Sequence, residues 1–164
     1  MKNLIGILVA ACVIAGCSGA KGQRGESTQA AADTATTRFA ADADSLFKYV
    51  SDQVELGPRV PGSDAHRLCG DLILNRLKAS GIDSVAVQLA EVETFKGDRH
   101  MARNIMGRVN PGAGKRVLLI AHYDTRPWAD NDPVAEERIR PVDGANDGAS
   151  GVAVLLEAAR LLGR

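Results

Sequence analysis

The feature that most constrains the fold is a run of five residues, 117–121, in which every side chain is apolar. A turn-forming stretch rich in Pro and Gly precedes it at residues 110–114, and a polar sequence begins directly after it at His122. A strand with one face in water alternates apolar and polar side chains, whereas an unbroken apolar strand is covered on both faces. Residues 117–121 therefore predict a central strand of an α/β sheet.

Two amphipathic helices are predicted before the strands. The first ends at Gly57 and Pro58, and the second begins at Ser63 and ends at Gly81, because Ser caps helix starts and Gly terminates helices. Apolar residues recur at helical spacing in both: Leu46, Phe47, Val50 and Val54 in the first, and Leu68, Leu72, Ile73 and Leu77 in the second.

Strands and a last helix complete the layout. Alternation at Val85, Val87 and Leu89 predicts a half-buried strand, and residues 103–109 predict another. Residues 150–162 predict a strongly apolar helix, which we expect to be buried against the sheet. This order predicts a three-layer α/β/α sandwich with a mixed sheet and a site at the carboxyl ends of its strands. Because only three strands are clear, we expect the C-terminal part of the fold to lie beyond Arg164.

The first 38 residues differ from this domain, which we place at residues 39–164. An apolar run at residues 4–15, too short to span a bilayer, leads into Gly16 and Cys17 and resembles a bacterial lipobox. We therefore predict a lipoprotein signal peptide at residues 1–16 and a lipidated Cys17 with a flexible polar tether at residues 17–38. Ser18 is not an inner-membrane retention aspartate, which favours a lipid anchor in the bacterial cell envelope at the outer membrane. The alternative is an ordinary cleaved signal with an incidental cysteine.

Charge and cysteine content exclude some classes of protein. Twenty basic and 20 acidic side chains balance, so no global positive field would recruit nucleic acid. Cys12 falls in the signal and Cys17 at the anchor, which leaves Cys69 as the one cysteine of the mature domain within this sequence. It cannot form an internal disulfide by itself. Its place on the apolar side of the second helix predicts a small core residue.

Two polar clusters carry the chemistry. His122 and Asp124 follow the apolar run and share one side of the chain, so the imidazole could bind zinc while the carboxylate orients it. In isolation an ordinary hydrogen-bonded turn explains this pair equally well. The second cluster, residues 143–148, places Asp147 among very small residues just before the last helix. The two clusters together favour a zinc site.

These segments resemble a known family. Residues 118–162 are similar to the zinc-dependent aminopeptidase family that also contains the animal-type glutaminyl-peptide cyclotransferases, and residues 57–63 and 104–107 resemble its opening. The resemblance implies that His122 and Asp147 bind metal and that Asp124 orients His122. It implies two zinc ions in an aminopeptidase and one in a cyclotransferase, where Asp147 stays a ligand and His122 need not be one.

Residues 126–133 with residues 144–148 most resemble bacterial members of the cyclotransferase branch. The resemblance implies that Trp128 lines an apolar substrate pocket near the zinc; the alternative is a hydrophobic plug beneath its loop. The implied function is conversion of an N-terminal glutamine to pyroglutamate with release of ammonia. A zinc aminopeptidase that hydrolyses N-terminal peptide bonds is the alternative, and a non-catalytic peptide-binding lipoprotein is a third. Peptide or protein N-termini are the expected substrates.

Several functional residues of that family have no match here. We expect its catalytic glutamate, a further acidic ligand and a late histidine to lie beyond Arg164, so that these 164 residues alone are an incomplete and inactive fragment. Glu157 is too far along the last helix to substitute. His66 is expected on a helix surface and His100 in a loop, neither as a ligand.

Overall fold

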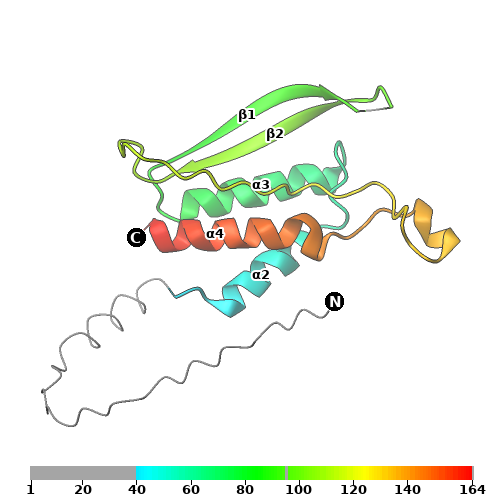
Figure 1. The fold of residues 1–164 in the computed structure, drawn as a ribbon, viewed down its shortest axis with the longest axis horizontal. Coiled ribbons are helices and arrows are strands. Elements are labelled where there is room, and N and C mark those ends of the chain that lie inside the picture. The colour runs from blue at the N-terminus through cyan, green and yellow to red at the C-terminus, as the bar shows by residue number, and fades with distance from the viewer. Residues whose placement is uncertain (1–39, 95, 164) are drawn as a thin grey trace, which may run out of the picture. The chain divides into compact units, whose positions relative to one another are not determined.

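The computed structural model describes residues 40–94 and 96–163 (Figure 1). The predicted signal peptide, Cys17 and tether lie outside these residues. The described elements in chain order are α2 (Ala43–Val54), α3 (Asp64–Ala79), β1 (Ser84–Glu93), β2 (Arg99–Arg108), the 3₁₀ turn η1 (Ala135–Ile139), the π-type turn η2 (Ala145–Ala149) and α4 (Ser150–Leu162). This is the mixed α/β class that the sequence predicts, with a small sheet. None of the described helices has the length and apolar character that crossing a bilayer requires.

The two predicted N-terminal helices are confirmed, and both begin at a side-chain cap. Asp42 accepts a hydrogen bond from the backbone nitrogen of Asp44 at 3.1 Å, so α2 starts at Ala43, before the apolar spacing that begins at Leu46. Ser63 accepts from the backbone nitrogen of His66 at 3.1 Å, as its type and position predict. These caps satisfy donors that would otherwise have no partner in the first turn.

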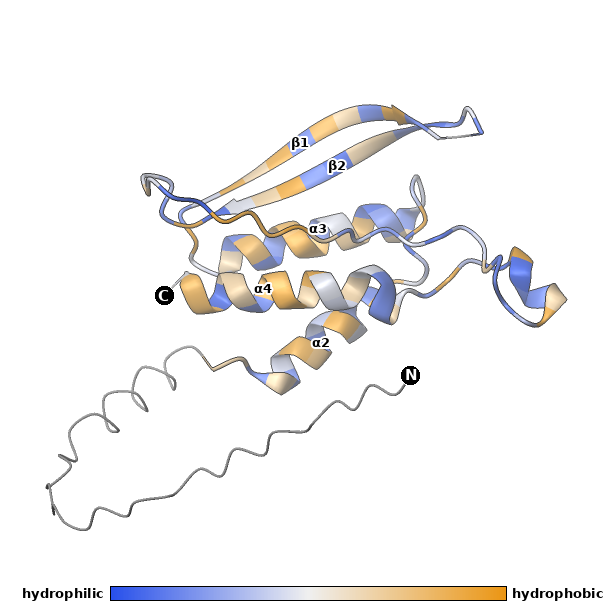
Figure 2. Ribbon diagram, viewed as in Figure 1, coloured by the Kyte–Doolittle hydropathy of each residue, from blue (hydrophilic) through white to orange (hydrophobic). Residues whose placement is uncertain are grey.

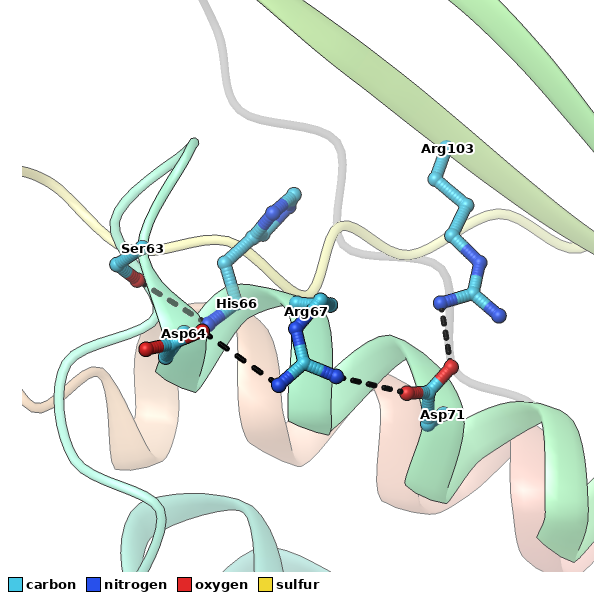
Figure 3. A network of polar contacts seen from close by, with 6 residues as sticks. All are labelled: Ser63, Asp64, His66, Arg67, Asp71 and Arg103. Atoms are coloured by element: carbon cyan, nitrogen blue, oxygen red, sulfur yellow. Dashed lines mark hydrogen bonds and ion pairs between the residues drawn. The ribbon is translucent and has the colours of Figure 1, made fainter.

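The two described strands pair only with each other. β1 and β2 form an antiparallel hairpin whose register runs from Ser84 opposite Arg108 to Glu93 opposite Arg99. Since β2 begins at Arg99, His100 lies in a strand and not in a loop, which corrects that expectation. Arg103 of β2 binds Asp71 of α3 at 2.7 Å and so joins the hairpin to this helix. Figure 3 shows the network continuing through Arg67 to the first turn of α3.

The core lies between α3 and α4. Its buried members are Cys69, Ile73 and Leu77 from α3 with Val152, Leu156 and Ala159 from α4. We expected α4 to pack against the sheet; in the structure α4 contacts α2 and α3, and α3 contacts the strands. Figure 2 shows the apolar length of α4 running beside α3. Ala121 and Tyr123 pack against the edge of this core, which brings the segment before the candidate site next to α3 and α4.

The prediction of a covered strand at residues 117–121 is wrong for the described part of the chain. These residues are extended but have no ladder partner, and Val117, Leu118 and Ile120 are 87%, 80% and 81% exposed. The physical reason is that an apolar run sets only a need for cover. In the described part of the chain β1 and β2 pair only with each other, and neither forms a ladder with this segment.

Burial also departs from the apolar spacing elsewhere. Phe47, Leu68 and Leu89 are exposed, although their spacing placed each on an inward face. Conversely, the polar side chains of Gln53, Arg59 and Glu157 are buried. Each of these polar side chains has hydrogen-bond partners inside the protein, which is what permits its burial.

Candidate metal centre

The residues predicted as metal ligands face each other. The Nε2 atom of His122 lies 3.0 Å from Oδ1 of Asp147, and both side chains are more than half exposed. His122 follows the extended segment 117–121, and Asp147 lies in η2 just before α4. Two segments far apart in sequence thus place an imidazole and a carboxylate together where a ligand can reach them.

The second ring nitrogen of His122 is held by Asp124. Nδ1 lies 3.1 Å from the backbone oxygen of Asp124 and 3.6 Å from its carboxylate Oδ1. A carbonyl oxygen only accepts, so Nδ1 must donate, and in a neutral imidazole this leaves the lone pair on Nε2. The orienting role expected for Asp124 therefore falls first on its backbone oxygen and second on its side chain.

That tautomer makes the contact with Asp147 unusual. A lone pair on Nε2 would face a carboxylate oxygen at 3.0 Å, and two electron-rich atoms attract at this distance only with a cation between them. A proton on the imidazole supplies one such cation, and a metal ion supplies another. Imidazole nitrogen and carboxylate oxygen are both ordinary zinc ligands. The residues present therefore fit a zinc ion, as two members of its ligand set.

Glycine makes this approach possible. Gly148 has a φ of 101°, and a Cβ placed on it would lie 3.3 Å from two atoms of the His122 ring and 3.2 Å from the backbone oxygen of Asp124. Gly144 has a φ of 62°, and its Cβ would lie 2.5 Å from the Thr125 methyl group. Side chains at either position would strain the backbone and push the Asp147 loop away from His122.

The loop that carries Asp147 is held at its start by Arg59. This side chain is fully buried, and its guanidinium donates to the carbonyl oxygens of Asp143 and Gly144, the second at 2.8 Å. Its Nε donates to the carbonyl oxygen of Tyr123 at 3.2 Å. Burial lowers the pKa of Arg59 below its ordinary value, although an arginine remains charged near neutral pH.

The far end of the same loop is held by Gln53. Its side-chain amide is fully buried and donates to the carbonyl oxygens of Ala149 and Tyr49, at 3.1 and 2.7 Å. Sequence reasoning missed both Arg59 and Gln53. The only available signal for Arg59 was its place in the segment 57–63, whose resemblance to the family was noted without a role for any one residue.

The structure gives the other candidate residues contacts that differ from those of a metal ligand. Trp128 is half-buried, with Nζ of Lys96 at 3.9 Å from its ring centroid, so its part in a substrate pocket stays a prediction. His66 stacks on Tyr123 with ring centroids 4.6 Å apart, and burial lowers its pKa, so it is not a free surface residue. Glu157 is buried in a two-bond ion pair with Arg160, at 2.6 and 2.7 Å, and is thereby excluded as the catalytic glutamate.

Two ligands do not complete a zinc site, which in proteins takes four. Across residues 40–94 and 96–163, no three His, Cys, Asp or Glu side chains gather closely enough to hold a metal ion. Cys69, the cysteine of the core, is fully buried, and this burial raises the pKa of its thiol to about 11. The described residues therefore bring His122 and Asp147 together as a partial ligand set.

Part of the chain matches a peptidase family, and most of it is similar to solved bacterial enzymes. Residues 104–164 match the model of peptidase family M28. The chain is 48% identical to a glutaminyl cyclase from Bacteroides thetaiotaomicron, solved with bound N-acetylhistamine, with a TM-score of 0.72 over 74% of this chain and 41% of that one. It is 44% identical to the glutaminyl cyclase of Porphyromonas gingivalis, with a TM-score of 0.73 over 76% of this chain and 43% of that one.

A zinc-dependent exopeptidase from Parabacteroides distasonis is equally similar, with 48% identity and a TM-score of 0.72 over 74% of this chain and 41% of that one. The chain therefore spans less than half the length of each of these three structures. Cyclases and an exopeptidase resemble it about equally, so the comparisons leave the choice between these two activities open.

Proposed function

Because the chain belongs to peptidase family M28, as its motifs predicted, we propose that the full-length protein is a zinc-dependent enzyme acting on peptide N-termini. More specifically, we propose a glutaminyl-peptide cyclotransferase. The observation that carries the proposal is the pairing of His122 Nε2 with Asp147 Oδ1 at 3.0 Å, with Asp124 fixing the other ring nitrogen. The resemblance of residues 126–133 and 144–148 to the cyclotransferase branch favours cyclisation as the reaction.

In this proposal His122 and Asp147 would hold the zinc. When bound, zinc supplies a Lewis acid that polarises the γ-carbonyl of an N-terminal glutamine. The Asp124 carbonyl keeps the Nδ1 proton of His122 in place, so the Nε2 lone pair stays directed at the metal position. The carboxylate of Asp147 adds a negative charge that favours binding of a cation beside it. Asp124 is thus a positioning residue and not a group that touches the substrate.

The proposed reaction is an intramolecular substitution. The α-amine of the peptide attacks its own γ-carbamoyl carbon, a new C–N bond closes the ring, and the bond to the amide nitrogen breaks. The proton lost by the amine ends on the leaving ammonia. The proton-shuttling glutamate and further ligands that the resemblance implies have no match among residues 1–164. Trp128 is proposed to line the pocket for the glutamine side chain.

A zinc aminopeptidase is the second candidate, favoured by the likeness to the Parabacteroides exopeptidase. In that reaction water attacks the first peptide bond and a free amino acid leaves. The proposed metal count follows the reaction, with one zinc ion for a cyclotransferase and two for an aminopeptidase.

The deciding experiment uses the full-length protein without its signal and tether, with zinc and a peptide that begins with glutamine. Mass spectrometry that shows loss of ammonia from an otherwise intact peptide supports the cyclotransferase. Release of the N-terminal amino acid establishes the aminopeptidase. Peptide that binds but remains unchanged supports the non-catalytic binding lipoprotein. The Asp147→Asn variant is the control, because either activity is expected to disappear with it.

We also propose that the protein is lipid-anchored in the bacterial envelope through Cys17. The test is metabolic labelling with a palmitate analogue in a bacterial host. Label in the wild type and none in Cys17→Ala supports the anchor. Label in neither protein would favour the ordinary cleaved signal.

A further inference from the structure

We propose that Arg59 is a positioning residue that sets the spacing between His122 and Asp147. The inference rests on the zinc site of the proposed function and assigns the residue that assembles it. Arg59 lies in the loop between α2 and α3, and its side chain donates to backbone oxygens and not to the side chain of either ligand. Its effect is therefore exerted through the backbone.

The guanidinium joins the two segments that carry the ligands. Nε donates to the carbonyl oxygen of Tyr123, which stands between His122 and Asp124 in the chain. Nη1 and Nη2 donate to the carbonyl oxygens of Asp143 and Gly144, at the start of the turn that carries Asp147. The backbone oxygen of Arg59 also accepts from the nitrogen of Thr125 at 3.0 Å. One residue thus holds both sides of the site in a fixed relation.

The burial of this charge is costly, which argues for a specific role. Arg59 is 0% exposed, and within the described residues its side chain forms no ion pair with a carboxylate. A buried ionic group rarely adds stability over an apolar residue of similar size. What the guanidinium offers here is three donors in a fixed planar arrangement, aimed at three carbonyl oxygens. No apolar side chain or single ammonium can reproduce that geometry.

The fit around the guanidinium is close. A Cβ on Gly144 would lie 3.0 Å from Nη2 of Arg59, so the loop reaches the guanidinium only because residue 144 has no side chain. The same glycine carries the carbonyl that accepts from Nη2 at 2.8 Å. A change at Arg59 is therefore expected to shift the start of the Asp147 loop and the separation of Asp147 from His122.

The test compares zinc affinities of the full-length protein, measured by competition with a chromophoric chelator. Arg59→Met removes all three donors at similar volume, and Arg59→Lys keeps the charge with one donor group. We expect zinc to bind at least tenfold more weakly to Arg59→Met, which is the range seen for residues that orient ligands. Arg59→Lys is expected to recover only part of the loss. Arg160→Met is the matched control, since Arg160 is paired with Glu157 on α4.

Two further measurements distinguish a positioning role of Arg59 from a general loss of stability. In the metal-free protein, the ¹⁵N shifts of the His122 ring report its tautomer and its contact with Asp147, and they should change in Arg59→Met but not in Arg160→Met. If Arg59→Met does not fold, Arg59→Lys carries the same comparison. Millimolar ethylguanidinium should restore zinc affinity to Arg59→Ala, because it can occupy the vacated donors' positions.

The outcomes distinguish this inference from the proposed function. Wild-type zinc affinity that disappears in His122→Ala, with no change in folded Arg59→Met, overturns the role of Arg59 and leaves the zinc site standing. A wild-type protein that binds no zinc overturns the proposed function itself. Equal losses in Arg59→Met and Arg160→Met would show an effect of stability alone and would also overturn the inference.

Discussion

The Nε2 atom of His122 faces Oδ1 of Asp147 at 3.0 Å, while the backbone oxygen of Asp124 holds the opposite ring nitrogen at 3.1 Å. Because Nδ1 donates to this oxygen, the tautomer and the orientation of the imidazole ring are fixed. A metal ion that binds between His122 and Asp147 would meet two ligands already in place, so few groups need to become ordered on binding.

The distances around the His122 ring predict which substitutions at the site weaken zinc binding most. His122→Ala and Asp147→Asn each remove a proposed ligand, and each is expected to weaken zinc binding by at least 100-fold in the full-length protein. Asp124→Asn should weaken it less than tenfold, because the closer contact to Nδ1 comes from the backbone oxygen, which the substitution retains. Chelator competition measures all three. A loss in Asp124→Asn as large as in His122→Ala would show that the carboxylate is the group that orients the ring.

Gly148 is expected to be intolerant of any side chain. Gly148→Ala places a methyl group 3.3 Å from the His122 ring in a backbone with φ of 101°, and we expect a cost of about 1–3 kcal/mol in the free energy of unfolding. Zinc affinity should fall as well, because the Asp147 loop must move. Chemical denaturation and chelator competition measure the two effects.

Gly112→Ala is the matched control for this substitution. A Cβ at residue 112 meets no atom within 4 Å, and its φ lies outside the left-handed region. We expect the control to change stability by less than about 0.5 kcal/mol. Equal effects of the two substitutions would contradict the close approach at Gly148.

Local sequence signals predicted much of the fold. The cap at Ser63, the helix of residues 150–162 and the strand around Val85 follow from patterns within a few residues, and the structure confirms them. The proximity of His122 to Asp147 was also expected, because the two clusters that carry these residues together favoured one zinc site. Their role as zinc ligands stays a prediction.

The features that could not be predicted depend on contacts between residues that are distant in the sequence. Arg59 is a polar residue in a loop, and Gln53 is a polar residue on a helix. The spacing of apolar residues around them does not show that their side chains are buried and donate to backbone carbonyl oxygens. The exposure of residues 117–120 has the same origin. An apolar run predicts a need for cover, but the cover itself depends on which strands lie beside it, and that information is not local.

The buried pair of Glu157 and Arg160 predicts an acid-sensitive stability. Two hydrogen bonds from Arg160 hold the pKa of Glu157 below its ordinary value of 4.5, with a further contribution from the backbone nitrogen of Asp42. Because the folded pKa is lower than the unfolded one, the stabilisation is complete above about pH 4.5 and is lost as the pH falls through the lowered pKa.

Glu157→Gln should therefore lower the free energy of unfolding by about 1–3 kcal/mol at pH 7 and flatten its decline below pH 4.5. Urea denaturation at a series of pH values measures both quantities. Glu136→Gln, at an exposed position in η1, is the control and should follow the wild-type curve. An unchanged slope in Glu157→Gln would place the acid sensitivity at other carboxylates.

Cys69 is expected to be chemically inert in the folded protein. Burial raises its thiol pKa from 9.0 to about 11, so at pH 8 only about one thiol in a thousand is ionised, and the thiolate is the reactive form. The side chain is also 0% exposed, which keeps reagents away from the sulfur. In protein that lacks the signal and tether, iodoacetamide should therefore leave Cys69 unmodified under native conditions and label it rapidly in denaturant. The Cys69→Ala variant supplies the blank for any other thiol. Labelling of native Cys69 at the rate of an unfolded thiol would mean that the α3–α4 core opens readily, and the burial that defines this core would then need revision.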